Sequence, residues 1–200
     1  HGQDMRRMGG LRKYMPVTYW TCLVGTLALL GFPGLSGFFS KDIIIEAIKH
    51  SDTEGHTYAY WCVLIGVFVT ALYSFRLVFY AFHGKERFRE PAPHAHGGHG
   101  DHGHDDHARV HEPHESPWVV TVPLILLAIP SIFAGALFVG PIVFGGYFGE
   151  SIVILPQHDG LAQLAKDFHG AVGMIAHGFF TLPFWLVTAG IVGVLIRGAG

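Results

Sequence analysis

Four ionisable side chains lie close together within one otherwise apolar stretch of the sequence. Residues 31–50 read GFPGLSGFFSKDIIIEAIKH, and the four charges are Lys41, Asp42, Glu46 and Lys49. A charged side chain within a bilayer costs roughly 2.5–3.5 kcal/mol on insertion scales, so such residues are candidates for function. Burial favours the neutral form of an amine, whereas a nearby acid favours its charged form. These residue types, in this setting, are therefore suited to taking up and releasing protons.

The spacing of the four residues predicts how they face their surroundings. On a helix, Asp42, Glu46 and Lys49 share one face, because they are spaced four and three residues apart. Lys41 lies about 100° round the helix from Asp42, so we expect it to point at a different neighbour. A structural ion pair between Lys41 and Asp42 that fixes a helix junction is the alternative. Glu46 is the weaker candidate, because a solvated helix end would also explain it together with Lys49.

The helix that must carry these residues is interrupted just before them. Pro33 removes a backbone donor and clashes with the preceding turn, and Gly31, Gly34 and Gly37 let the backbone leave helical geometry. Freed backbone groups cannot face lipid, so such a break must be buried in protein or line a hydrated cavity. Broken helices with ionisable groups are a known construction for ion pathways at the bilayer midplane.

The composition is that of an integral membrane protein. Half of the 200 residues are hydrophobic, 14% are charged, and the mean hydropathy is +0.38, whereas soluble domains carry about 25% charged residues. A net charge of −2 gives no basis for nucleic-acid binding. We predict an all-α fold, a multi-span helical bundle with one Pro/Gly-broken helix. The four predicted spans cover residues 14–50, 57–83, 118–148 and 170–197.

The distribution of basic residues favours a single crossing by the broken helix. With one crossing over 14–50, nearly all basic loop residues fall on one side, and Lys166 is the one basic loop residue on the other side, beside five acidic ones. With two crossings, the basic segment 85–89 changes side and the bias is lost. Lys and Arg accumulate in cytoplasmic loops. The predicted loops are a cytoplasmic basic loop over 1–13, a cytoplasmic loop over 84–116 and a periplasmic loop over 149–169.

The 84–116 loop contains a His-rich stretch over residues 94–114, with eight histidines and three aspartates. Imidazole binds Zn²⁺, Ni²⁺ and Cu²⁺, but Gly-rich His tracts lack the fixed ligand geometry of a structural site. We therefore predict a disordered loop with adventitious metal affinity, against the alternative of a dedicated metal role. The candidate ligands are His94, His96, His99, His102, His104 and His107.

Three segments carry a resemblance to a known family. They are MRRMGGLRKYMP (5–16), GTLALLGFPGLSGFFSKD (25–42) and TALYSFRLVFYAFHG (70–84). These segments resemble the antiporter-like subunit 5, or chain L, of respiratory complex I, the proton-pumping NADH:quinone oxidoreductase. The resemblance is strong over about residues 1–90, loose over 117–200 and absent from the His-rich stretch. It implies a fragment from the second half of a longer chain, namely the broken helix of the second inverted repeat and the three spans after it.

The resemblance implies a function and a set of partners. Lys41, with Asp42 beside it, would belong to the family's chain of membrane-embedded charges, in a non-redox subunit of a proton-translocating enzyme. No cofactor is expected in this chain, because NADH and quinone would act elsewhere in the complex. The implied partners are the lipid bilayer and other membrane subunits of complex I, especially a neighbouring antiporter-like subunit. The implied location is the bacterial inner (plasma) membrane.

Two alternatives stay open at this point. Related cation/proton antiporter subunits and hydrogenase-linked subunits share the same core, although FRLVFYAFHGK (75–85) favours complex I. A zinc transporter would explain the His-rich loop, but it needs His and Asp ligands four residues apart in its membrane helices. His177 is followed at that spacing by Thr181, and Asp42 by Glu46. A membrane histidine such as His177 is either a proton relay or a side chain held by one hydrogen bond.

Overall fold

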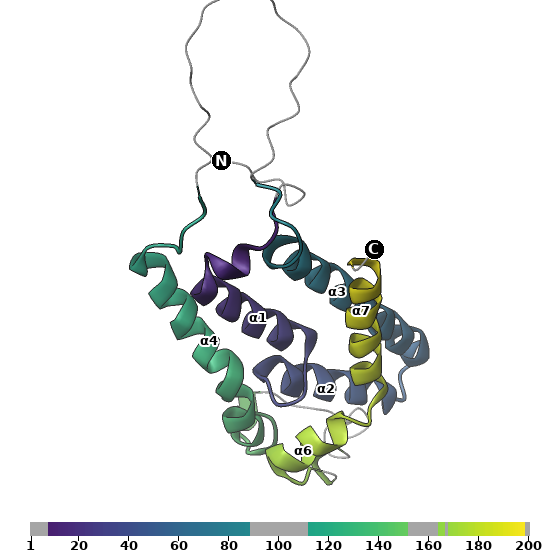
Figure 1. The fold of residues 1–200 in the computed structure, drawn as a ribbon. Coiled ribbons are helices and arrows are strands. Elements are labelled where there is room, and N and C mark those ends of the chain that lie inside the picture. Colours follow the sequence, from purple (N-terminus) through teal and green to yellow (C-terminus); the bar gives the residue numbers. More distant parts are fainter. Residues whose placement is uncertain (1–7, 89–111, 152–163, 167, 199–200) are drawn as a thin grey trace, which may run out of the picture.

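The computed structural model describes residues 8–88, 112–151, 164–166 and 168–198, and this part of the chain is helical and contains no strand. Figure 1 shows the helices packed as one bundle. They are α1 (Pro16–Leu30), α2 (Ser36–Lys49), α3 (His56–Phe82), α4 (Trp118–Val139), α6 (Gly170–Gly178) and α7 (Leu182–Gly198). Short 3₁₀ turns lie at Leu11–Lys13 and Gly149–Ser151, and a π-helical segment, Gly140–Phe144, extends α4. The predicted all-α fold is confirmed.

The predicted Pro/Gly break lies between α1 and α2. Gly31 ends α1 in the left-handed region, with φ of 73°, which a residue without Cβ adopts at no steric cost. The Gly31 N–H then bonds to the Ala28 carbonyl and the Phe32 N–H to the Leu27 carbonyl, both at 3.1 Å. This is the Schellman pattern, and it satisfies two carbonyl groups that the helix end would otherwise leave free.

Gly37 has a different structural role from the one expected. Gly37 lies inside α2 rather than in the connection, so it does not release the backbone from helical geometry. A Cβ at this position would collide with the Ala28 carbonyl oxygen of α1. Gly37 therefore allows the first turn of α2 to lie directly against the last turn of α1.

A second break divides the last span. Residues 170–197 were expected to form one helix, but α6 and α7 are bent by 53° across residues 179–181. Pro183 explains the break, because in a continuous helix its ring would clash with the carbonyl of residue 179. In the structure, Pro183 instead lies in the first turn of α7, where a missing N–H costs nothing.

By length and composition, two or three spans can be recognised among the described residues. His56–Phe82 and Trp118–Phe144 are each long and apolar enough to cross a membrane, and the bent pair α6–α7 passes the same test together. Helix α1 is apolar but shorter. The four-span arrangement, with 14–50 as one span, stays a prediction.

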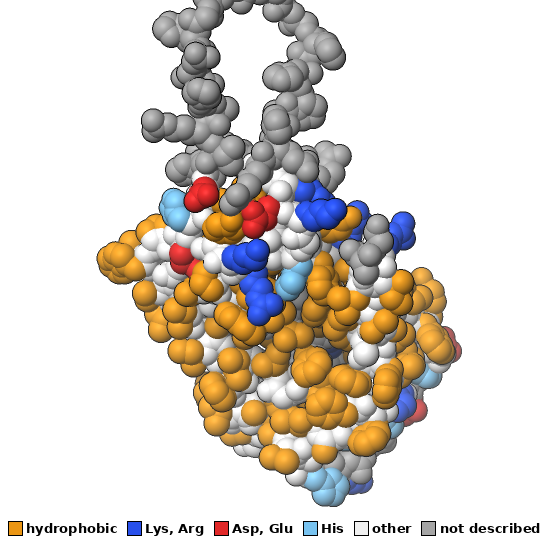
Figure 2. Space-filling view, in the orientation of Figure 1, with side chains coloured by type: hydrophobic (Ala, Val, Ile, Leu, Met, Phe, Trp, Pro, Cys, Tyr) orange, Lys and Arg blue, Asp and Glu red, His pale blue; other side chains and the backbone are white. Residues whose placement is uncertain are grey.

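Several chain segments that are far apart in sequence meet at one end of the bundle. The start of α1, the end of α3, the start of α4 and the end of α7 lie there (Figure 1). The Gly10 N–H bonds to the His83 carbonyl at 3.4 Å, and Glu86 lies 3.7 Å from Lys13 Nζ. Figure 2 shows Lys and Arg side chains gathered at this end and hydrophobic side chains covering the flank. The compartment that this end faces stays a prediction.

The central core joins four of the helices. Val67 and Ala71 of α3 pack against Val187 of α7, with Leu30 of α1 and Ile45 of α2 in the same buried cluster. Leu30 and Ile45 lie close to the two candidate residues in sequence and in space. The core therefore holds the α1–α2 break against α7.

Candidate functional site

Lys41 lies in the second turn of α2 and reaches back to the end of α1. Its Nζ donates a hydrogen bond to the Leu30 carbonyl oxygen at 3.2 Å. Leu30 is the last residue of α1, so its carbonyl belongs to the set that has no partner within the helix. The carbonyl end of a helix also carries partial negative charge, which favours a cation there. The break between the two helices thus creates the acceptor that holds the Lys41 amine.

Asp42 is buried, with a relative exposure of 7%. Among the described residues, its carboxylate makes no hydrogen bond, and the ion pairs there do not include one between Lys41 and Asp42. The structural ion pair considered above is therefore not formed. A buried carboxylate without a partner is costly, so its retention calls for a role other than holding the helix junction together.

Lys41 and Asp42 line the same small cavity. Its volume is about 10 Å³, and its walls come from α1, α2, the α6–α7 turn and the start of α7. We expected Lys41 to point at a different neighbour from Asp42. Its amine does bond to α1, yet both side chains border this one space. Thr181 is the polar residue on the opposite wall, and the rest of the lining is apolar or glycine.

The second break packs directly onto the first. The Phe38 ring of α2 lies where a Cβ on Gly178 would have to go. Phe32, in the α1–α2 connection, makes edge-to-face contacts with Phe179 and Phe184, with ring centroids 6.3 and 5.9 Å apart. The two interrupted helices therefore meet at their breaks, with Lys41 and Asp42 between them.

His177, at the end of α6, is exposed and is one of the electrostatic neighbours of Asp42. From the sequence alone, this histidine is an isolated residue with no connection to Asp42. The signal for the second break was present in the sequence as Gly178 followed by Pro183. The nearness of His177 to Asp42 was not predictable, because nothing in the spacing relates residue 42 to residue 177.

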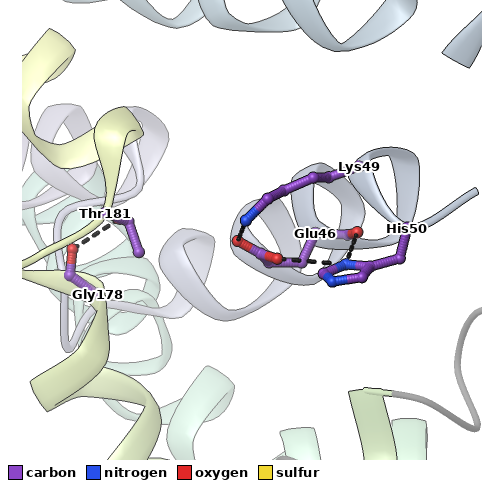
Figure 3. A network of polar contacts seen from close by, with 5 residues as sticks. All are labelled: Glu46, Lys49, His50, Gly178 and Thr181. Atoms are coloured by element: carbon purple, nitrogen blue, oxygen red, sulfur yellow. Dashed lines mark hydrogen bonds and ion pairs between the residues drawn. The ribbon is translucent and has the colours of Figure 1, made fainter. Parts of the chain in front are cut away.

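Glu46 lies one turn beyond Asp42 and has partners on its own helix. Its carboxylate is 3.5 Å from Lys49 Nζ and 3.5 Å from His50 Nδ1. Figure 3 shows Glu46 of α2 between Lys49 and His50, with Gly178 at the end of α6 and Thr181 of the α6–α7 turn in the same view. Lys49 and His50 are exposed. These contacts are those of a charged helix end, and they make Glu46 a weaker candidate than Asp42.

The predicted metal ligands cannot be placed. His94, His96, His99, His102, His104 and His107 lie outside the described residues. Within the described ranges, there is no group of three or more His, Cys, Asp or Glu side chains that could hold a metal ion.

Comparison with known proteins gives a consistent result. Residues 1–73 match the family model described as NADH:quinone oxidoreductase/Mrp antiporter, transmembrane. The chain is 46% identical over 195 residues to the NADH-quinone oxidoreductase subunit L of Neisseria meningitidis serogroup B, a match that covers 96% of this chain and 28% of the relative. It is 39% identical over 163 residues to the NADH-ubiquinone oxidoreductase chain 5 of Chondrus crispus, covering 78% of this chain and 22% of the relative.

A further relative matches nearly the whole chain. The NADH-quinone oxidoreductase subunit L of Mycobacterium tuberculosis is 34% identical over 196 residues, covering 98% of this chain and 25% of the relative. The chain thus spans about a quarter of the length of the curated relatives it matches. The family model covers the α1–α2 break with Lys41 and Asp42. The chain belongs to the family of antiporter-like membrane subunits of NADH:quinone oxidoreductase.

Proposed function

We propose that this chain is part of a membrane subunit that translocates protons in NADH:quinone oxidoreductase, or complex I, with Lys41 and Asp42 in the proton path. The oxidation of NADH and the reduction of quinone would take place in other subunits, and this chain would need no cofactor of its own. Its partners would be other membrane subunits of the complex, a neighbouring antiporter-like subunit among them. In a bacterium it would lie in the plasma membrane.

One observation carries the proposal. The Lys41 amine is held at the free carbonyl end of α1, 3.2 Å from the Leu30 oxygen, and shares a small cavity with a buried carboxylate that has no partner among the described residues. Such a pair can exist in more than one protonation state without breaking a structural ion pair. The names of the relatives, which include subunit L of NADH-quinone oxidoreductase, support the complex in which this would happen.

The energy that a titrating lysine must supply is moderate. Moving one proton against 100 mV requires about 2.3 kcal/mol, and one pKa unit corresponds to about 1.36 kcal/mol. A lysine whose pKa alternates by roughly two units, as neighbouring charges move, could therefore accept and release a proton against that field. The half-buried position of Lys41 beside a helix end and a second ionisable group is a setting in which such alternation is possible.

Substitution of Lys41 in the full-length subunit within the assembled complex tests the proposal. Lys41→Met keeps the length of the side chain and removes the titrating group, so the complex should assemble but pump poorly. Lys41→Arg keeps a charge but hardly deprotonates, so it should fail nearly as badly. The measurement is proton uptake or release by proteoliposomes, with assembly checked separately by gel electrophoresis in mild detergent.

A purely structural lysine predicts the reverse order. Arginine would then behave like the wild type, because it can still donate to the Leu30 carbonyl, and methionine would lower assembly. Full pumping by Lys41→Arg would remove Lys41 from the proton path. Repeating the assay with sodium replaced by potassium distinguishes proton pumping from the cation/proton exchange suggested by the second half of the family name.

A further inference from the structure

The α6–α7 turn is placed where it can complete the site formed by Lys41 and Asp42. Phe38 and Asp42 lie one turn apart on α2, and Phe38 packs on Gly178 just before the turn. Thr181, at the end of the turn, borders the cavity together with Lys41 and Asp42. Three polar side chains, two from α2 and one from the α6–α7 turn, therefore converge on one small cavity.

The cavity has the size and the lining that a single water molecule needs. Its volume of about 10 Å³ is at the lower end of what one ordered water occupies, roughly 10–15 Å³ on the same measure. Buried waters typically make about three hydrogen bonds. An apolar cavity of this size would stay dry, but this one presents an ammonium, a carboxylate and a hydroxyl.

The hydrogen-bonding capacities of the three groups fit one water between them. Lys41 has three N–H donors, and one is used by the Leu30 carbonyl. Asp42 is buried with no partner among the described residues. The Thr181 hydroxyl donates to the Gly178 carbonyl at 2.8 Å, which leaves its oxygen free to accept. A water could then accept from Lys41 and donate to both Asp42 and Thr181.

We propose that Thr181 is a positioning residue for proton transfer, and that its hydroxyl holds a water molecule between Lys41 Nζ and the Asp42 carboxylate. The water accepts a proton from the Lys41 ammonium and gives one of its own protons to Asp42. The products are a neutral lysine amine, a protonated aspartate and the same water, and the reverse step restores the starting state. This inference rests on the proposed function, and it adds the second broken helix to the proton path.

The alternative is that the Thr181 hydroxyl only braces the turn through its bond to Gly178. Thr188 provides a control, because it lies on α7 just beyond the turn, is half-buried like Thr181, and its hydroxyl likewise donates to a backbone carbonyl, that of Phe184, at 2.9 Å. Thr188 does not border the cavity. Thr181→Val and Thr188→Val each remove a hydroxyl that bonds to a backbone carbonyl. Only the Thr181 hydroxyl also borders the cavity with Lys41 and Asp42.

The experiment measures proton translocation per NADH oxidised by the assembled complex in proteoliposomes. Thr181→Val should lower the translocation rate about fivefold, as expected for the loss of one hydrogen bond to the transferring group. Thr181→Ser should restore it, and Thr188→Val should leave it at the wild-type rate. Equal rates in Thr181→Val and Thr188→Val would overturn the proposal.

A second measurement does not depend on how the variant folds. A high-resolution density map of the wild-type complex should show a water between Lys41 and Asp42, within hydrogen-bonding distance of Thr181 Oγ1. A map of sufficient resolution without that water would overturn the proposal. If the Lys41 variants pump normally, the proposed function fails. If the Lys41 variants do not pump and Thr181→Val pumps at the wild-type rate, the proposed function stands and only the role of Thr181 fails.

Discussion

The Glu115 carboxylate accepts a hydrogen bond of 2.8 Å from the Val17 N–H, although the two residues are 98 positions apart. A second bond of 2.6 Å comes from the Thr18 hydroxyl. Val17 and Thr18 lie in the first turn of α1, whose N-cap residue, Met15, provides no side-chain cap. Glu115 thus supplies the cap from the segment that leads into α4. The positive end of the helix dipole adds to this attraction.

Replacing this cap should destabilise α1 in a pH-dependent way. Partial burial alone would raise the pKa of Glu115, but the hydrogen bonds from Thr18, Val17 and Ser116 outweigh it and lower the pKa below its ordinary value. The stabilisation is therefore fully present above the ordinary glutamate pKa of about 4.5 and is lost as the pH falls through the lowered pKa of the folded protein. Glu115→Ala should cost about 1 kcal/mol at neutral pH.

The measurement is thermal stability of the purified complex at a series of pH values. The difference between wild type and Glu115→Ala should shrink on acidification through pH 4.5 and below. Glu54→Gln is the matched control, since Glu54 is an exposed carboxylate in the connection between α2 and α3. A pH-independent difference would show that the carboxylate charge is not what stabilises α1.

The close contact between α1 and α2 should not tolerate a methyl group at residue 37. In Gly37→Ala, the new Cβ would collide with the Ala28 carbonyl oxygen and lie 2.9 Å from its carbon. Overpacking of this kind typically costs about 1–3 kcal/mol, and here it would also move Lys41 relative to the Leu30 carbonyl. Gly25→Ala, on α1, meets no atom within 4 Å and should be neutral or slightly stabilising. Equal thermal stability and pumping in the two variants would contradict this account of the break.

The first break was predictable because its cause is local. Pro33 and the glycines around it interrupt a strongly apolar pattern, and the charged residues that follow mark the result as functional. The second break has weaker punctuation, with only Gly178 and Pro183 at its edges, and the run of apolar residues on either side favoured one continuous span. Local signals in the sequence therefore located the helices. Of the two interruptions, they located only the one between α1 and α2 as a break.

The contacts that build the site were not predictable, because they join distant segments. Nothing in the sequence pairs Lys41 with the Leu30 carbonyl, since that acceptor exists only once α1 ends at Gly31. The approach of Thr181 to Asp42 depends on aromatic packing between Phe32, Phe179 and Phe184. Likewise, the Glu115 cap depends on how the segment before α4 lies against the start of α1. These are tertiary contacts, which periodicity and spacing do not encode.

The predicted topology can be tested by labelling. Residues 1–13, 84–116 and 197–200 should face the cytoplasm, because basic loop residues concentrate there. With Cys22 and Cys62 replaced in the full-length chain, single cysteines at Gly98 and Gly160 should react with membrane-impermeant reagents from opposite sides. Labelling of both cysteines from the same side would rule out the four-span arrangement.

The His-rich stretch should contribute metal affinity but little to pumping. We expect replacement of residues 94–114 by a Gly/Ser linker of equal length to leave pumping within about twofold, since a flexible solvated loop adds little packing. Binding of Ni²⁺ and Zn²⁺ by the purified complex should fall in the same variant. If pumping is lost while the complex still assembles, the stretch has a dedicated role, and adventitious metal binding is the wrong interpretation.

Asp42 and Glu46 provide the sharpest internal comparison, because they are carboxylates one turn apart on the same helix. Asp42 is 7% exposed and has no partner among the described residues, whereas the Glu46 carboxylate lies 3.5 Å from Lys49 Nζ and 3.5 Å from His50 Nδ1. Groups that transfer protons typically contribute 10²–10⁴-fold to a rate. Asp42→Asn should therefore lower proton translocation in proteoliposomes by at least about tenfold without loss of assembly.

Glu46→Gln should remain within about twofold of the wild type, because an exposed helix-end pair is worth only about 0.2–1 kcal/mol. Asparagine keeps the shape of the Asp42 side chain and its ability to hydrogen bond, so a loss in that variant alone is a loss of titration. A larger loss of proton translocation in Glu46→Gln than in Asp42→Asn would contradict this account. The proton path would then run through Glu46, at the exposed end of α2, with Lys49 in place of Lys41 as the titrating amine.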